Sequence, residues 1–255
     1  MKTLFIGQNA IYVKSLASTN SYASELLRQI GLLEGSLIYT FEQEKGRGQR
    51  GNTWESEPNK NLTLSLVLHP HFLDASQQFL LTKITSLAVA DLMAEFLGSS
   101  SYSARIHIKW PNDIYVNDKK IAGILIENYL RENSIQHAIV GVGINVNQTV
   151  FQTAPNALSL AGLTQTTFDL KECLERFCSC FEARYLQLKN NKLQQLHEDY
   201  LFYLYRLNEW STYRTINDHL FEGNIKGVSG IGKLQVELVS GEIKEFDLKE
   251  IAFTI

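Results

Sequence analysis

The sequence predicts an α+β fold, in which a mixed β-sheet flanked by helices is followed by a small β-barrel. Three observations predict it. The runs Ile121–Ile126 and Ala138–Ile144 are apolar on both faces of a strand, as expected for central strands of a covered sheet. Segments with helical periodicity flank these runs in the chain. After Ser211 the chain changes to short β-like runs separated by glycines, which is typical of small barrels.

The first part of the chain is expected to hold short strands and one helix. Strands are predicted at Met1–Gly7, 36–42 and 62–68. Asn20 is the expected cap of a helix whose apolar positions follow helical spacing until Gly31. Residues 43–60 are predicted to form a long polar loop, and loops of that length in a compact domain are usually functional or disordered.

Asp74 to Gln77 resembles a capping box, which is expected to open a long helix that ends at Gly98. The next segments are β-rich, at 105–109, 113–117, 120–129 and 135–146. A second helical stripe runs from Leu170 to Leu188. It carries the three cysteines, Cys173, Cys178 and Cys180, which we expect to be small buried residues without a chemical role.

Composition and charge exclude several classes of protein and several kinds of site. The formal net charge of −3 argues against a general nucleic-acid binder, so any anion site must be local. Three clustered cysteines make a poor disulfide framework, and no signal peptide or run of ~18 apolar residues is present. The six histidines show no zinc-site spacing. We therefore expect a cytoplasmic protein with no membrane span and no metal site built from side chains.

The segment from Gln43 to Trp54 places Lys45, Arg47 and Arg50 among alternating glycines. Glycines allow backbone N–H groups to turn toward an anion, and the cations supply charge, so the segment fits a phosphate-binding loop. It lacks the Gly-Lys-Ser/Thr ending of a Walker loop. A solvated hairpin loop has the same composition. Trp54 fits either a core position or stacking on a purine.

Three polar groups lie in or beside the predicted strands. Pro111 separates two strands, and Asn112 and Asp113 follow where the chain turns. Lys120 opens a buried strand and fits a phosphate partner, although a lysine at a polar hairpin tip fits equally well. Asn145 is expected within an apolar strand, where its amide contacts either an adenine edge or the backbone.

Taken in order, five segments closely resemble the biotin–protein ligase family: Ser18–Asn20, Gly46–Trp54, Lys109–Asp113, Lys120–Glu127 and Gly141–Asn147. The resemblance covers nearly the whole chain. It implies a catalytic domain over residues 1–208, similar to class II aminoacyl-tRNA synthetases, and an SH3-like barrel over 209–255. It also implies that Mg-ATP and biotin give biotinyl-AMP and pyrophosphate. The biotinyl group would then pass to one lysine of a biotin carboxyl carrier protein, of acetyl-CoA carboxylase or a related carboxylase.

The resemblance implies roles for individual residues. The catalytic residues would be Lys120, Arg47 and Asp113, with Asp113 as the proton acceptor in the transfer step. Biotin would contact Ser18, Thr19, Asn20, Gln43, Gly46, Arg47, Gly48, Lys120 and Gly123. ATP would contact Gln49, Arg50, Trp54, Asn112, Asp113, Lys120 and Asn145. The segment Gly46–Gly51 would be a lid over biotin and its adenylate.

The chain departs from this pattern at two points. Ser18–Asn20 lies too close to Met1 for the DNA-binding winged helix of bifunctional members, so no DNA binding is expected. Gln49 stands where many members have arginine, and this neutral side chain leaves open how tightly the adenylate is retained, but not whether it forms. The resemblance implies a monomer or a homodimer joined at sheet edges, and Ala138–Val146 fits either a core strand or such an edge.

Two alternative functions stay open from the sequence. A lipoate or octanoate ligase or transferase shares the architecture, but its Arg-Arg-X-X-Gly-Gly-Gly type segment is not found here. A non-catalytic binding module would use the loop and the barrel only to hold a partner.

Overall fold

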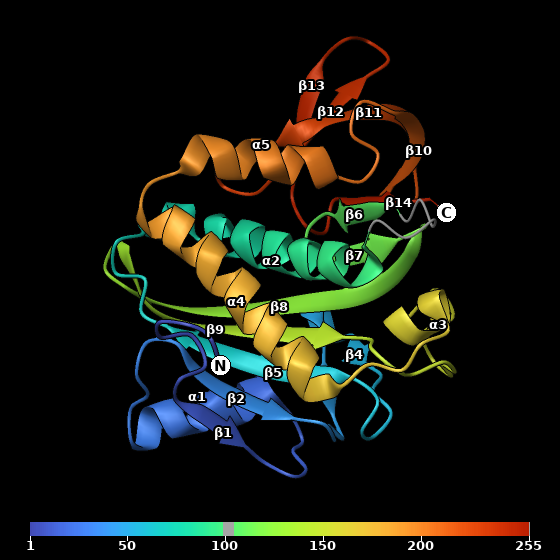
Figure 1. Cartoon of the computed structure of the whole chain (residues 1–255). Helices are drawn as coiled ribbons and strands as arrows, with labels where there is room; N and C mark the ends of the chain where they lie inside the picture. The colour runs from blue at the N-terminus through green and yellow to red at the C-terminus, as the bar shows by residue number, and fades with distance from the viewer. Residues whose placement is uncertain (99–104, 255) are drawn as a thin grey trace.

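The computed structural model describes residues 1–98 and 105–254 (Figure 1). A seven-stranded sheet has the order β1-β2-β5-β9-β8-β7-β6. β1 runs parallel to β2 and the other neighbours are antiparallel, which confirms the predicted mixed sheet. The strands are β1 (Ala10–Tyr12), β2 (Ser36–Thr40), β5 (Leu62–Leu68), β6 (Ile106–Lys109), β7 (Asp113–Val116), β8 (Lys119–Arg131) and β9 (Ser134–Ile144). β9 lies between β5 and β8, so it is a core strand and not an edge.

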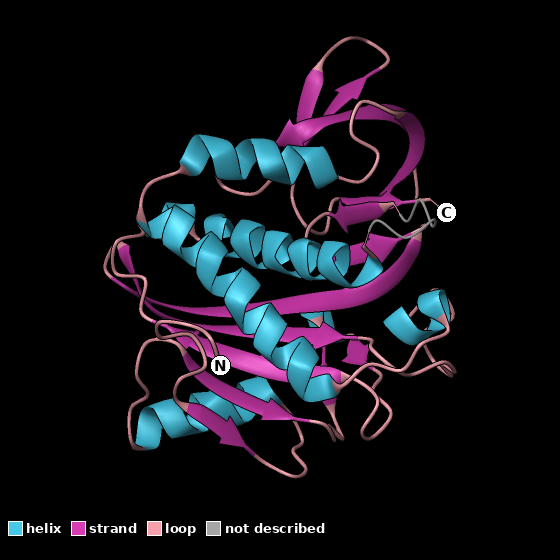
Figure 2. Ribbon diagram, in the orientation of Figure 1, coloured by secondary structure: helices cyan, strands magenta, loops and turns pink. Residues whose placement is uncertain are grey.

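Helices cover both faces of this sheet. α2 (Phe79–Leu97) and α4 (Leu170–Lys189) pack against each other and against one face, in front of the strands in Figure 2. α1 (Thr19–Gln29) contacts β2, β5 and β9. The chain also forms α3 (Leu160–Thr164) and α5 (Leu193–Tyr203), which the sequence did not predict. None of the helices in the described ranges is long and apolar enough to cross a membrane.

Alternation along the central strands explains why both faces are covered. Leu66 of β5 and Val140 of β9 belong to the large apolar cluster that includes α2 and α4. The next residues, Val67 and Ile139, belong to a separate small cluster with Ala23 of α1. Because successive side chains of a strand point to opposite faces, the strands must be apolar at consecutive positions.

The C-terminal segment forms a five-stranded antiparallel sheet of order β13-β12-β11-β10-β14, at the position of the predicted barrel. Its strands are β10 (Trp210–Thr215), β11 (Leu220–Val228), β12 (Leu234–Leu238), β13 (Ile243–Phe246) and β14 (Ile251–Phe253). Over the described residues no ladder joins β13 to β14. Tyr213 and Val236 belong to the large cluster, so the apolar core is continuous between the two sheets. The boundary after residue 208 stays a prediction.

The predicted first strand at Met1–Gly7 is wrong. The backbone N–H groups of Leu4, Phe5 and Ile6 donate to the buried carboxylate of Glu182 on α4 instead of to a neighbouring strand. A carboxylate that accepts three N–H groups is a strong anchor, and it fixes the start of the chain on α4.

Three further local predictions need correction. Ser18, not Asn20, caps α1, and its side chain accepts the N–H of Ser21. The loop 43–60 contains a hairpin of β3 (Gly46–Arg47) and β4 (Thr53–Trp54). The capping box at Asp74 is present but opens a short 3₁₀ turn, and α2 begins at Phe79.

The three cysteines are buried, as predicted. All three lie on α4, and burial raises the pKa of each thiol to about 12. Thiols with so high a pKa are poor nucleophiles at neutral pH, which agrees with a packing role.

Lys83 of α2 is a buried cation. Its Nζ lies 3.1 Å from Nδ1 of His197 and above the rings of Phe79 and Tyr200. Over the described residues it makes no ion pair with a carboxylate. Burial lowers its pKa to about 8, because the charged form is poorly solvated there.

The variant Lys83→Met tests this penalty. Between about pH 8 and the ordinary lysine pKa of 10.5 the unfolded chain binds more protons than the folded one, so the stability of the parent rises with pH in that window. Below this pH window, Lys83 is protonated in both the folded and the unfolded chain, and the folded protein bears the full cost of burying the charged lysine. We expect the free energy of unfolding of the variant to exceed that of the parent by about 1–3 kcal/mol at neutral pH. This difference should shrink toward pH 10.5. Urea denaturation of both proteins at the two ends of the pH window measures this difference. A stability gain of Lys83→Met that does not depend on pH would contradict a buried charge at Lys83.

Candidate active site

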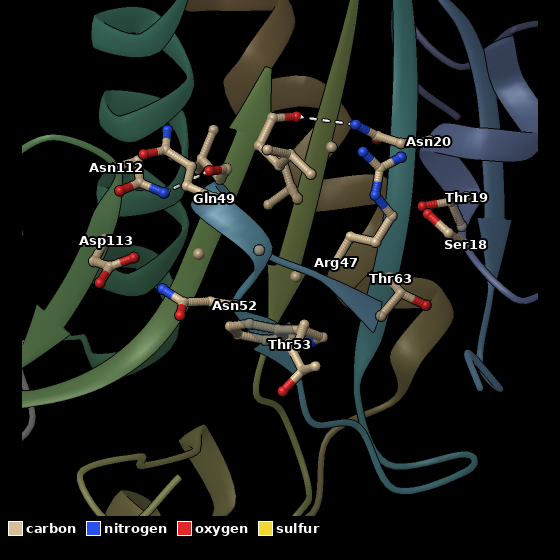
Figure 3. Close-up of a pocket in the computed structure, with 18 of the residues that line it drawn as sticks. Ser18, Thr19, Asn20, Arg47, Gln49, Asn52, Thr53, Thr63, Asn112 and Asp113 are labelled. Atoms are coloured by element: carbon tan, nitrogen blue, oxygen red, sulfur yellow. Dashed lines mark hydrogen bonds between the residues drawn. The ribbon is translucent and has the colours of Figure 1, made fainter. Parts of the chain in front are cut away.

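A cavity of about 230 Å³ opens on the face of the sheet that carries α1 (Figure 3). Much of its lining comes from the residues that the sequence predicted: Ser18, Thr19, Asn20, Gln43, Arg47, Gly48, Gln49, Trp54, Asn112, Asp113, Lys120 and Gly123. These residues come from segments that are far apart in the chain. The fold therefore brings most of the predicted site together in one place.

Two paired glycines form part of the cavity floor. Gly143 of β9 pairs with Gly123 of β8, and neither presents a side chain. The indole of Trp54 lies on this bare backbone. A Cβ at Gly143 would stand 2.4 Å from Cε2 of Trp54, and a Cβ at Gly123 would stand 3.0 Å from Cζ3. Any larger residue at Gly143 would displace the ring.

Asn20 lies over the next glycine of β9. A Cβ at Gly141 would stand 2.3 Å from its Oδ1. That Oδ1 accepts the hydroxyl of Ser65 at 2.7 Å, and Nδ2 donates to Glu127 at 2.7 Å and to the carbonyl of Leu125 at 3.2 Å. The buried amide is thus held by protein partners at both ends and shapes the cavity wall.

The N-terminus of α1 faces the same cavity. Ser18 caps the helix, and the N–H of Thr19 donates to Oε1 of Gln43 at 2.9 Å. The orientation of the Gln43 amide follows from this bond, because its oxygen must face the helix terminus. Its Nε2 is then the end of the amide that this bond leaves unused.

Lys120 and Asp113 form an ion pair at the cavity, with 2.7 Å between Nζ and Oδ1. A β-bulge makes this contact. Asp113 pairs with Gly123, but Tyr115 pairs with Lys120, so β8 has one extra residue between these pairs. Because alternation would otherwise put Lys120 and Gly123 on opposite faces, the bulge turns the lysine toward the cavity. The sequence showed no signal for it.

The loop before Asp113 is fixed by backbone contacts with β8. Nδ2 of Asn112 donates to the carbonyl of Ile124 at 2.7 Å, and the N–H of Ile124 donates back to the carbonyl of Asn112 at 3.0 Å. The Trp110–Pro111 peptide is cis. Asn112 and Asp113 therefore stand side by side at the cavity with oxygen atoms to offer.

Behind Asp113, Lys109 and Tyr115 extend the polar region along the sheet. Nζ of Lys109 donates to the hydroxyl of Tyr115 at 3.1 Å. Burial lowers the pKa of Lys109 and raises the pKa of Tyr115, since each loses solvent around its charged form.

The hairpin β3–β4 lies over the cavity and is attached at both ends. Arg47 reaches Oε1 of Glu127 with Nη2 at 3.1 Å and the hydroxyl of Ser21 with Nη1 at 3.2 Å. After β4, Glu55 accepts hydrogen bonds from Gln152, Thr153 and Gln148. Burial alone raises the pKa of Glu55, but these hydrogen bonds outweigh it and lower the pKa.

Two predicted residues, Gly46 and Asn145, do not line the cavity. Gly46 pairs with Trp54 in the hairpin, where a Cβ would stand 2.3 Å from the Trp54 carbonyl oxygen. The predicted place of Asn145 within a strand is wrong, because β9 ends at Ile144 and Asn145 follows it. It donates to the carbonyl of Leu158, while its buried Oδ1 has no partner among the described residues. The side chain of Arg50 lies outside the described part of the structure.

Sequence reasoning missed some cavity residues, namely Asn52, Thr53, Thr63, Gly141, Gly143 and Leu248. Gly141 and Gly143 had a detectable signal, since glycines two apart in a strand leave one face bare. Leu248 follows β13 and reaches the cavity only through the tertiary fold. In the described ranges no group of three His, Cys, Asp or Glu residues could hold a metal ion.

Comparison with known proteins agrees with this geometry. The model of the biotin/lipoate A/B protein ligase family matches residues 12–145, which include most of the cavity. The bifunctional ligase/repressor of Bacillus subtilis is 31% identical over 251 residues, covering 94% of this chain and 73% of that protein. The biotin–[acetyl-CoA-carboxylase] ligase of Paracoccus denitrificans is 33% identical over 219 residues, covering 82% of this chain and 88% of that protein. The biotin protein ligase of Aquifex aeolicus in complex with biotin and ATP superimposes with a TM-score of 0.77 at 26% identity, over 97% of this chain and 99% of that chain.

The substitution Gly143→Ala tests the glycine floor. The added methyl group must push the Trp54 ring away, and overpacking of this kind costs about 1–3 kcal/mol. Gly230→Ala is the matched control, because nothing lies within 4 Å of its Cβ position. We expect a lower urea midpoint and altered tryptophan fluorescence for Gly143→Ala alone. Equal behaviour of the two variants would show that Trp54 does not rest on Gly143.

Proposed function

The chain belongs to the biotin/lipoate A/B protein ligase family, and on that premise we propose that it is an ATP-dependent biotin–protein ligase. One observation carries the proposal: Arg47 and Lys120, far apart in the sequence, both line the same cavity. A relative and a solved structure that each cover most of the chain are named as biotin ligases, and the structure is a complex with biotin and ATP, which favours biotin over lipoate or octanoate.

The proposed reaction has two steps. A carboxylate oxygen of biotin attacks the α-phosphorus of ATP, the new O–P bond gives biotinyl-AMP, and the bond to pyrophosphate breaks. The ε-amine of the target lysine then attacks the biotinyl carbonyl carbon, an amide forms, and AMP leaves while the amine loses its proton. The first step brings two anions together, so positioning and positive charge are the main contributions of a protein.

Lys120 and Arg47 would supply that charge. We assign Lys120 to the biotin carboxylate and the α-phosphate, with Asp113 holding its ammonium group in place at 2.7 Å. Arg47 lies on the hairpin above the cavity and would neutralise the same anions from that side. Asp113 is also our candidate to accept the proton of the target lysine.

The biotin head would lie at the N-terminus of α1. Gln43 Oε1 already accepts the N–H of Thr19, so Nε2 remains to donate to the ureido oxygen of biotin. We assign the ureido N–H groups to Ser18, and the remaining wall of this end to Asn20, Gly48 and Gly123.

The nucleotide would occupy the end near Trp54. Oδ1 of Asn145 is buried beside the cavity wall and has no donor among the described residues, so it would accept the amino group of adenine once that wall opens for the nucleotide. Gln49 and, by its position in the loop, Arg50 would approach the phosphates. Mg²⁺ would accompany ATP to neutralise phosphate charge, and the oxygens of Asn112 and Asp113 suit a hard cation that keeps most of its other ligands from water and phosphate.

The protein partner in this proposal is a biotin carboxyl carrier protein of acetyl-CoA carboxylase or a related enzyme, as in the name of the Paracoccus relative. A cytoplasmic location is part of the proposal, because three unpaired thiols persist in a reducing compartment.

Biotin-dependent exchange of pyrophosphate label into ATP tests the function. Reversal of the first step moves the label, so we expect exchange with biotin and little with lipoate or octanoate. Exchange with lipoate or octanoate but not biotin would assign another substrate. Absence of exchange with all three would favour a binding module.

The variant Lys120→Ala is expected to slow this exchange by about 10²–10³, the usual loss on removing one preorganised charge donor. Lys119→Ala is the matched control, because Lys119 is the exposed neighbouring lysine of β8. Rates within twofold of the parent for both variants would remove Lys120 from the mechanism.

A further inference from the structure

Glu127 of β8 joins two segments that approach the cavity from different elements. One oxygen of its carboxylate, Oε1, lies 3.1 Å from Nη2 of Arg47 in the β3–β4 hairpin and forms an ion pair with it. The other oxygen, Oε2, accepts a hydrogen bond of 2.7 Å from Nδ2 of Asn20 in α1. Both segments belong to the proposed biotin site, although Glu127 itself does not line the cavity. A single side chain outside the cavity thus connects two of its walls.

The two contacts of Glu127 differ in mobility. Asn20 is buried and fixed by Ser65 and Leu125 as well, so Glu127 has a rigid support on that side. The side chain of Arg47 is 50% exposed and that of Glu127 is 29% exposed. The arginine is therefore the mobile partner, and the carboxylate is the fixed one.

The other end of the hairpin is anchored separately. Glu55 accepts hydrogen bonds from the N–H and hydroxyl of Thr153, at 2.7 Å and 2.6 Å, and from the N–H of Gln152 at 2.8 Å. This multiple attachment fixes the segment that follows Trp54. On the Arg47 side, the ion pair with Glu127 and the bond to the Ser21 hydroxyl are the only contacts among the described residues that connect the arginine side chain to the body of the protein. The Arg47 contact is the weaker of the two attachments.

We propose that Glu127 is a positioning residue for biotin binding, which holds Arg47 over the cavity before the ligand arrives. The incoming carboxylate takes Nη1 of Arg47 from the neutral Ser21 hydroxyl, while Glu127 keeps Nη2. Exchange of a neutral partner for a charged one is favourable, because charge-assisted hydrogen bonds are the stronger ones. The arginine then needs no new side-chain geometry when the ligand binds, so less ordering has to accompany binding. The inference rests on the proposed function for the identity of the ligand, but its claim about the empty protein does not.

The substitution Glu127→Gln removes the charge and keeps a carbonyl oxygen that can accept from Asn20. We expect amide hydrogen exchange in residues 46–54 of the empty protein to become about fivefold faster, as loss of an ion pair of about 1 kcal/mol predicts. The KM for biotin is expected to rise by a similar factor while kcat stays within twofold. In an Arg47→Gln background, Glu127→Gln should raise the KM for biotin by less than about 1.5-fold, because the arginine that Glu127 holds is already absent.

Glu237→Gln is the matched control, since it removes a partly exposed ion pair, with Lys226, from the C-terminal sheet. It should leave hydrogen exchange in residues 46–54 and the KM for biotin at parent values. If Glu127→Gln lowers the melting temperature more than this control, Arg47→Gln removes the same ion pair from its exposed side and must give the same faster exchange.

The outcomes separate this inference from the proposed function. Faster exchange of residues 46–54 with no biotin-dependent activity would overturn the proposed function but not the role of Glu127 in holding Arg47. Parent-like exchange and parent-like KM in Glu127→Gln would overturn the role of Glu127, whatever the substrate is. An equal rise of KM in the parent and Arg47→Gln backgrounds would also overturn it, because Glu127 would then act independently of Arg47.

Discussion

The cavity depends on the bare backbone of two neighbouring strands. Gly141, Gly143 and Gly123 present no side chains on the face that carries α1, and Asn20 and Trp54 approach to distances that no Cβ would allow. Because the same strands are filled with branched residues on their other face, they can remain in the core of the sheet while one surface stays open. The hairpin, the α1 terminus and the bulged lysine are all arranged around this open surface.

The charges of the site are organised in pairs. Each described cation that lines the cavity has a carboxylate partner from the sheet, Lys120 with Asp113 and Arg47 with Glu127. In the empty protein these partners limit the cost of holding like charges close together, and they fix the cations in one orientation. A ligand with two anionic groups meets charge that is already positioned, which is the arrangement that a reaction between two anions requires.

The sequence predicted the parts that depend on local pattern. The central strands, the long helix α2 and the helix α4 followed from periodicity, and the order of five motifs identified most of the cavity residues. The errors have non-local causes. Met1–Gly7 is not a strand because Glu182, far along the chain, accepts its N–H groups. Residue spacing could not predict the bulge that turns Lys120, or the contact of Glu127 with Asn20 and Arg47. Both depend on how separate segments of the chain pair and pack.

The central claim is that this cavity activates biotin and passes it to a lysine of a carrier protein. Mass spectrometry of an intact, unmodified biotin carboxyl carrier domain, incubated with the protein, ATP and biotin, tests it most directly. The account predicts the addition of one biotinyl group, which is lost when the target lysine of the carrier is replaced by arginine. An unchanged carrier mass, or modification by lipoate and not by biotin, would contradict it.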